Sequence, residues 1–170
     1  DSSFAALIDQ IRPQLKHAKH FVFVDEGKIP EGYGSYGDLV SAAPVADAGR
    51  QGDDVAALFY TGGTTGRSKG VMLTHTNLVV NALQAVAVMD CQAGDKVLHV
   101  APMFHIADAF YCMTSLAVGG TNYFLPGFEP VATMRAIQDY QIARLLMVPT
   151  MINMLVNHPE IVDFELTGLR

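Results

Sequence analysis

Apolar residues recur with helical spacing near the start of this chain and then form a short continuous run. In the first helix-like stretch they occupy the i, i+3, i+4, i+7 and i+11 positions of an amphipathic helix, namely Phe4, Leu7, Ile8, Ile11 and Leu15. The run over residues 21–24 is uniformly apolar and predicts a short buried strand. Residues 25–54 are rich in Gly, Pro and Asp, which predicts a loop containing one short helix over residues 36–42.

From residue 55 onward the pattern alternates between strand and helix. We predict strands over residues 55–61, 70–73, 97–101, 121–125 and 144–148. The helices predicted between and after them cover residues 74–89, 105–118, 130–141 and 150–157. Such alternation is typical of an α/β fold, with a largely parallel sheet flanked by helices. The helix over residues 74–89 is apolar on nearly every side, which predicts that it is deeply buried.

Composition and charge narrow the range of functions. The chain has 170 residues, of which 50% are hydrophobic and 16% charged, enough to bury a core in one ordinary domain. A net charge of −6 disfavours a general nucleic-acid binder. The longest apolar runs are too short for a transmembrane segment. Cys91 and Cys112 lack the spacing of a zinc site or a disulfide framework, so we expect them to be buried and reduced in a soluble, cytoplasmic protein.

The strongest chemical signal is the stretch Y-T-G-G-T-T-G-R-S-K-G-V at residues 60–71. Its glycines allow backbone N–H groups to approach an anion closely, while its threonines and Lys69 add hydrogen-bond donors and positive charge. Residues 55–89 contain no Asp or Glu that would repel an anion. The stretch therefore predicts a phosphate-binding loop. No hydroxyl residue follows Lys69, which disfavours a Walker A loop and hence a P-loop NTPase or kinase.

The same twelve residues resemble the phosphate-loop signature of the adenylate-forming (AMP-binding) enzymes, Y-T-S-G-T-T-G-x-P-K-G-V. Gly62 replaces a serine or threonine, a variant similar to the fatty-acyl-CoA ligase branch, and Ser68 replaces a proline. The resemblance implies that this chain is part of the large N-terminal domain of an AMP-binding ligase.

Two further segments resemble motifs of that family. Residues 102–105, P-M-F-H, resemble the P-x-F-H segment of acyl- and aryl-CoA ligases, which lies by the acyl phosphate and shapes the acid pocket. Asp108 stands where many relatives carry glycine. Residues 148–150 resemble a V-P-T segment beside the acyl pocket, but a plain strand-to-helix junction explains them equally well. Both the loop and P-M-F-H follow predicted strands, whose carboxyl ends bind ligands in parallel α/β sheets.

The resemblance implies an ATP-dependent acyl-CoA ligase. Such an enzyme joins a carboxylic acid, here a fatty acid, to AMP with release of pyrophosphate, and CoA then displaces AMP. The implied catalytic residues are Lys69 and His105, and Thr61 would help hold Mg²⁺. The implied nucleotide-binding residues share the phosphate loop: Thr61, Gly62, Gly63, Thr64, Thr65, Gly66 and Lys69. The CoA site is expected outside this chain.

Several family motifs do not occur in this sequence, including the Y-G-x-T-E and T-G-D segments and the C-terminal domain with its adenylation lysine. We therefore expect residues 1–170 to form part of the N-terminal domain, about a third of a full enzyme, and to be inactive alone. Two alternatives stay open. One is an aryl-acid or amino-acid adenylation domain of the same family. The other, from a different class, is a stand-alone phosphate-binding module without catalysis.

Overall fold

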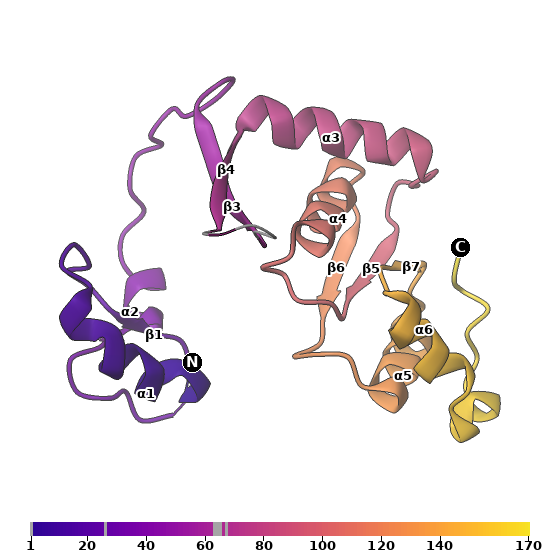
Figure 1. Cartoon of the computed structure of the whole chain (residues 1–170). Helices are drawn as coiled ribbons and strands as arrows, with labels where there is room; N and C mark the ends of the chain where they lie inside the picture. Colours follow the sequence, from indigo (N-terminus) through magenta and orange to yellow (C-terminus); the bar gives the residue numbers. More distant parts are fainter. Residues whose placement is uncertain (1, 26, 63–65, 67) are drawn as a thin grey trace. The chain divides into compact units, whose positions relative to one another are not determined.

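The computed structural model describes residues 2–25, 27–62, 66 and 68–170. The chain divides into two compact units, Asp1–Ala48 and Gly49–Arg170 (Figure 1). The second unit carries all the residues that the sequence indicates for phosphate and acid binding.

The first unit is a small helix-and-strand assembly around Arg12. Its elements are α1 (Ser2–Ile11), a 3₁₀ turn η1 (Arg12–Gln14), β1 (Val22–Phe23), β2 (Gly34–Ser35) and α2 (Tyr36–Val40). The Arg12 guanidinium lies 4.3 Å from the ring centre of Phe21 and 4.5 Å from that of Tyr33, a pair of cation–π contacts. The predicted buried strand is shorter than expected, and of its residues only Phe23 is buried.

The second unit begins with an antiparallel hairpin. β3 (Val55–Thr61) pairs with β4 (Lys69–Thr74), and Thr61 lies opposite Lys69 at the end of the pair from which the phosphate loop extends. α3 (His75–Val88) follows directly, because Thr74 forms a capping box: its Oγ1 accepts from the Asn77 N–H, and its own N–H donates to the Asn77 side chain. Among the described residues the hairpin forms a sheet of its own.

A three-stranded parallel sheet forms the rest of the unit (Figure 1). β5 (Lys96–His99) lies in the centre, between β6 (Thr121–Phe124) and β7 (Arg144–Leu145). The helices are α4 (Ile106–Ala117), α5 (Pro130–Tyr140) and α6 (Pro149–Val156), followed by the 3₁₀ turn η2 (Pro159–Asp163). The predicted α/β class with a parallel sheet and flanking helices is confirmed, while the hairpin is the antiparallel part.

Alternate residues of β5 face the two sides of this sheet. Leu98 packs with Ala136 and Ile137 of α5 in the main core cluster. His99, the next residue, instead bonds to Asp108 of α4. α4 and α5 therefore cover opposite faces of the sheet, as right-handed crossovers in opposite directions require.

Two predictions about burial are wrong. Within α3 only Ala82 is buried, whereas Leu83 is 56% and Val88 86% exposed. Among the described residues α3 packs mainly along α4 and meets the hairpin near its start, which leaves much of its surface exposed. Cys91 and Cys112 are free thiols as expected, but they are half-buried rather than buried. In the part of the chain that the structure describes, no helix combines the length and apolarity needed to cross a bilayer.

Candidate active site

The hairpin holds the two ends of the phosphate loop together. Thr61 and Lys69 form the last residue pair of β3 and β4, and the Thr61 hydroxyl donates to the Lys69 carbonyl oxygen over 3.4 Å. Gly63, Thr64 and Thr65, which the sequence assigns to phosphate binding, lie outside the described residues. Both described loop glycines have open backbones: a Cβ added to Gly62 or Gly66 would meet no atom of the described residues within 4 Å. Gly66 also has a φ of +152°, which favours glycine.

His105 begins the helix on the other side of the site. It is the N-cap residue of α4, and its Nδ1 accepts a hydrogen bond of 3.2 Å from the Ala107 N–H. A ring nitrogen that accepts carries no proton, so the capping ring is neutral and bears its proton on Nε2. His105 is exposed, which leaves the Nε2–H edge accessible to a ligand. The structure thus shows the ordinary capping role, and that role uses only one of the two ring nitrogens.

A hollow of about 400 Å³ joins the loop to the P-M-F-H segment. Tyr60, Thr61 and Gly62 line it from the hairpin, and Phe104 and His105 line it from the start of α4. The volume falls within the range of small-molecule sites, about 300–1,000 Å³. The structure therefore brings together two segments that the sequence singled out separately.

Lys69 lies near this hollow but is not part of its wall. It faces Thr61 across the hairpin, and neither it nor Gly66 is among the described residues that line the hollow. A second hollow, of about 660 Å³, lies between β4, α3 and α4. Val71 and Ile106 line both hollows, so the two adjoin.

The residues present fit a phosphate better than they fit a bare metal ion. Open glycine backbone and a threonine hydroxyl are the donors that a phosphate requires. Within the described ranges no group of three or more His, Cys, Asp or Glu side chains could hold a metal. Thr61 offers Mg²⁺ a single hydroxyl oxygen, and Mg²⁺ in phosphate sites takes most of its other ligands from phosphate and water.

The structure brings together three residues that the sequence did not predict to lie together, His99, Asp108 and Asn122. His99 is 1% exposed and Asp108 0%, and the His99 Nδ1 lies 3.0 Å from Asp108 Oδ1. The His99 Nε2 lies 2.8 Å from Asn122 Oδ1. The sequence did mark Asp108 as a departure from the family pattern, and the histidine inside the predicted strand 97–101 was the available sign of its partner.

Cys112 follows Asp108 by one helical turn. Burial, and secondly the Asp108 carboxylate, raise the pKa of the Cys112 thiol above its ordinary value. The thiol is therefore protonated at neutral pH and is not a nucleophile of this site.

Comparison with sequence families places this geometry among known proteins. The model of the family described as "AMP-binding enzyme" matches residues 1–170. The chain is 34% identical over 176 residues to a long-chain-fatty-acid–CoA ligase of Thermus thermophilus, covering 100% of this chain and 32% of that protein. It is 37% identical over 119 residues to a feruloyl-CoA synthase of an Amycolatopsis species, covering 69% of this chain and 24% of that protein. The chain thus spans about a quarter to a third of the length of these curated relatives.

Solved structures give the same result. The N-terminal domain of FACL13 from Mycobacterium tuberculosis matches with a TM-score of 0.79 and 26% identity, over 98% of this chain and 41% of that chain. ATP-bound MatB from Rhodopseudomonas palustris matches with a TM-score of 0.69 and 34% identity, over 83% of this chain and 28% of that chain. The family match over the whole sequence, the shared fold and the phosphate loop agree, and the chain belongs to the AMP-binding enzyme family.

Proposed function

We propose that this chain provides the phosphate loop and part of the acid pocket of an ATP-dependent, AMP-forming acyl-CoA ligase, as part of its large N-terminal domain. The observation that carries the proposal is the shared hollow, which Thr61 and Gly62 line from the loop and His105 lines from α4. An acid and the α-phosphate of ATP must meet in one place for adenylation, and this hollow joins the two segments that would bind them.

The chemical task is to hold a polyanion and offset the charge that develops on the departing pyrophosphate. The acid's carboxylate oxygen forms a bond to the α-phosphorus, and the bond from that phosphorus to the pyrophosphate oxygen breaks. Backbone N–H groups of residues 62–66, the hydroxyls of Thr61, Thr64 and Thr65, and the Lys69 ammonium would stabilise the β- and γ-phosphates. Mg²⁺, held partly by Thr61, would neutralise phosphate charge.

His105 would act as a hydrogen-bond donor in this reaction. Its Nδ1 is engaged by the Ala107 N–H, so its Nε2–H is the ring group available to a substrate oxygen. A donor at this position would bind the acyl phosphate oxygen of the adenylate. It would not remove a proton, and none needs to be removed from an ionised acid.

The walls of the hollow favour an acid without a positively charged group. The described residues that line the hollow are aromatic, aliphatic or polar. None of them carries a carboxylate that could pair with the α-ammonium group of an amino acid. The adjoining hollow is bounded largely by apolar residues such as Met72, Val80 and Phe110. Both features support a fatty or aryl acid over an amino acid. We assign the reaction to the cytoplasm, whose reducing conditions suit two free cysteines.

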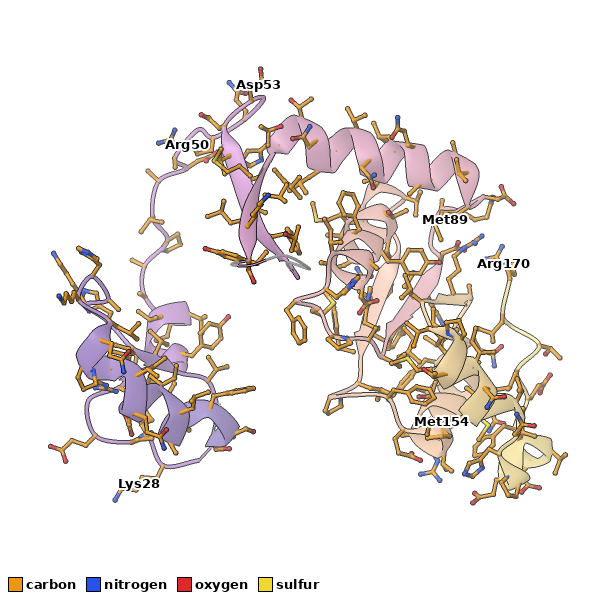
Figure 2. All side chains as sticks on the ribbon, in the orientation of Figure 1. Lys28, Arg50, Asp53, Met89, Met154 and Arg170 are labelled. Carbon is orange, nitrogen blue, oxygen red and sulfur yellow. The ribbon has the colours of Figure 1, made fainter. Side chains whose placement is uncertain are left out.

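The experiment is acid-dependent exchange of pyrophosphate into ATP by the protein made from its complete reading frame. We expect exchange with fatty acids, and a loss of about 10²–10³-fold in Lys69→Ala because a cation at the leaving pyrophosphate is removed. Lys28→Ala, an exposed lysine labelled in Figure 2, is the matched control and should exchange normally. Exchange with amino acids alone would show that the substrate is an amino acid and not a fatty acid. ATP binding without any exchange would support the stand-alone phosphate-binding module.

A further inference from the structure

The buried group behind the site lies where three elements meet. His99 ends β5, Asn122 lies in the neighbouring strand β6, and Asp108 lies in the first turn of α4 (Figure 1). The Phe124 ring of β6 stacks on the His99 imidazole, with 4.8 Å between ring centres and an interplanar angle of 18°. Water is excluded from both ionisable side chains of the pair.

Hydrogen bonds join His99 to both neighbouring elements. Its two ring nitrogens lie within hydrogen-bond distance of Asp108 Oδ1 and Asn122 Oδ1. One proton between His99 Nδ1 and Asp108, and one on Nε2, satisfy both contacts, whichever partner holds the shared proton. The imidazole therefore ties α4 to β6.

The bond between His99 and Asp108 is enclosed by protein. Asp108 Oδ2 has no hydrogen-bond partner among the described residues, so the bond to His99 is the side-chain contact that holds this buried group there. Removing one partner of a buried hydrogen bond leaves the other unsatisfied, which is costly.

Asp108 and His105 belong to the same helical turn. His105 caps the Ala107 N–H, and Ala107 directly precedes Asp108. Fixing the Asp108 carboxylate against β5 therefore fixes the backbone to which the His105 ring is bonded. The stretch from the end of β5 through the P-M-F-H segment is tied at both ends, by His99 and by Asp108.

We propose that His99 and Asp108 are positioning residues, whose buried hydrogen bond sets the orientation of His105 at the rim of the hollow. The consequence for catalysis rests on the proposed function. Loosening the pair should misplace the His105 Nε2–H, while the phosphate loop on the hairpin should keep its shape. The variant should thus lose kcat in acid adenylation and keep its KM for ATP.

The test uses Asp108→Asn, which preserves shape and replaces the carboxyl group by an amide, in the protein from the complete reading frame. Thr114→Val is the matched control, because Thr114 is another buried polar residue of α4 and its hydroxyl bonds only within the helix, to the Phe110 carbonyl. We expect Asp108→Asn to lower kcat about 10–100-fold with KM for ATP changed less than about twofold, since small misplacements of a reacting group cost this much. Thr114→Val should retain kcat.

A second measurement does not depend on activity or on the variant's folding. The nitrogen chemical shifts of the imidazoles in the unaltered protein should show His99 hydrogen-bonded at both nitrogens and His105 as the Nε2–H tautomer. If Asp108→Asn folds, His105 should become a mixture of tautomers. A His99 ring with a nitrogen that is not hydrogen-bonded would overturn the buried contact, and an unchanged kcat and His105 tautomer in folded Asp108→Asn would overturn the positioning role. If the unaltered protein exchanges no pyrophosphate, the proposed function fails. The imidazole chemical shifts would still show whether Asp108 sets the orientation of His105.

Discussion

Gly120 has no room for a single additional carbon. A Cβ at this position would lie 2.5 Å from Ser115 Oγ and 2.7 Å from the Asp95 carbonyl oxygen, closer than such atoms approach. Gly120 joins α4 to β6, so the close contact occurs where the chain enters the parallel sheet.

We therefore expect Gly120→Ala to lower the free energy of unfolding by about 1–3 kcal/mol, the usual cost of overpacking. Gly127→Ala is the control, because a Cβ there would meet no atom within 4 Å, and it should change stability by less than about 0.5 kcal/mol. Urea unfolding of the two variants measures the difference. Equal stabilities would show that the α4–β6 connection is looser than described.

At the scale of single residues, the sequence predicts features whose partner residues lie only a few positions away. Thr74 as a helix cap and the P-M-F-H segment at a strand's end could both be predicted, because their partners are a few positions away. The His99–Asp108–Asn122 group could not, since Asn122 is brought to His99 only by strand pairing. The capping of Ala107 by His105 is likewise a contact between residues two positions apart.

At the scale of elements, Arg144 of β7 joins the start of β5 to the end of α3. Its Nε donates over 2.6 Å to Oδ2 of buried Asp95, which directly precedes β5. Its Nη1 donates over 2.7 Å to the carbonyl oxygen of Met89, the C-cap residue of α3. A cation is favourable at a helix C-terminus, where carbonyl groups lack helical partners. Arg170 also donates to Asp95, which ties the end of the described chain to the same carboxylate.

Asp95 should make the stability of this unit depend on acid. Burial acts to raise its pKa, but the Gln92 N–H and the two arginines outweigh burial and hold the pKa below the ordinary value. A carboxyl group whose pKa is lower in the folded state stabilises the fold at pH values above its unfolded pKa of about 3.9. That stabilisation is lost as the pH falls through the pKa of the folded state.

We expect Asp95→Asn to be less stable than the unaltered protein at neutral pH, and the difference to shrink below about pH 4 as Asp95 is protonated. Urea unfolding between neutral and acid pH measures it. If the free energies of unfolding of the two proteins changed in parallel with pH, the acid dependence would not come from Asp95.

The α3 helix shows what hydrophobic spacing cannot predict. The sequence indicates which sides of a helix are apolar, and α3 is apolar nearly all round. Burial depends on whether another element lies against each side, and within this chain α3 has α4 along it and the hairpin at its start. Strand–helix alternation predicted a largely parallel sheet, whereas the order β6, β5, β7 and the short extent of β7, Arg144–Leu145, required the structure.

At the scale of the whole molecule, the α/β class and the two halves of the candidate site could be predicted because each rests on a local motif. What the sequence could not predict was that Thr61, Gly62 and His105 share one hollow, since that depends on how the hairpin meets α4. The family match covers all 170 residues, so the family assignment does not depend on the phosphate loop alone.

We predict that the 170-residue chain alone forms no acyl-adenylate from ATP, Mg²⁺ and a fatty acid. It spans 32% of the Thermus ligase, and the Y-G-x-T-E, T-G-D and C-terminal segments that complete the site in the family do not occur in it. Mass-spectrometric detection of the adenylate measures this, with the protein from the complete reading frame as the positive control. Adenylate made by the short chain would show that its own residues suffice.

The hairpin that carries the phosphate loop also bears on the order in which the protein folds. Thr61 and Lys69 are eight positions apart, so their pairing closes a short loop, and hairpins of this kind form in about 1–10 μs. The parallel sheet must instead join distant positions such as Val97 and Arg144, and such non-local pairing is slower. During synthesis the β3–β4 hairpin can therefore form before β7 has been translated, so the loop ends meet before the rest of the pocket exists.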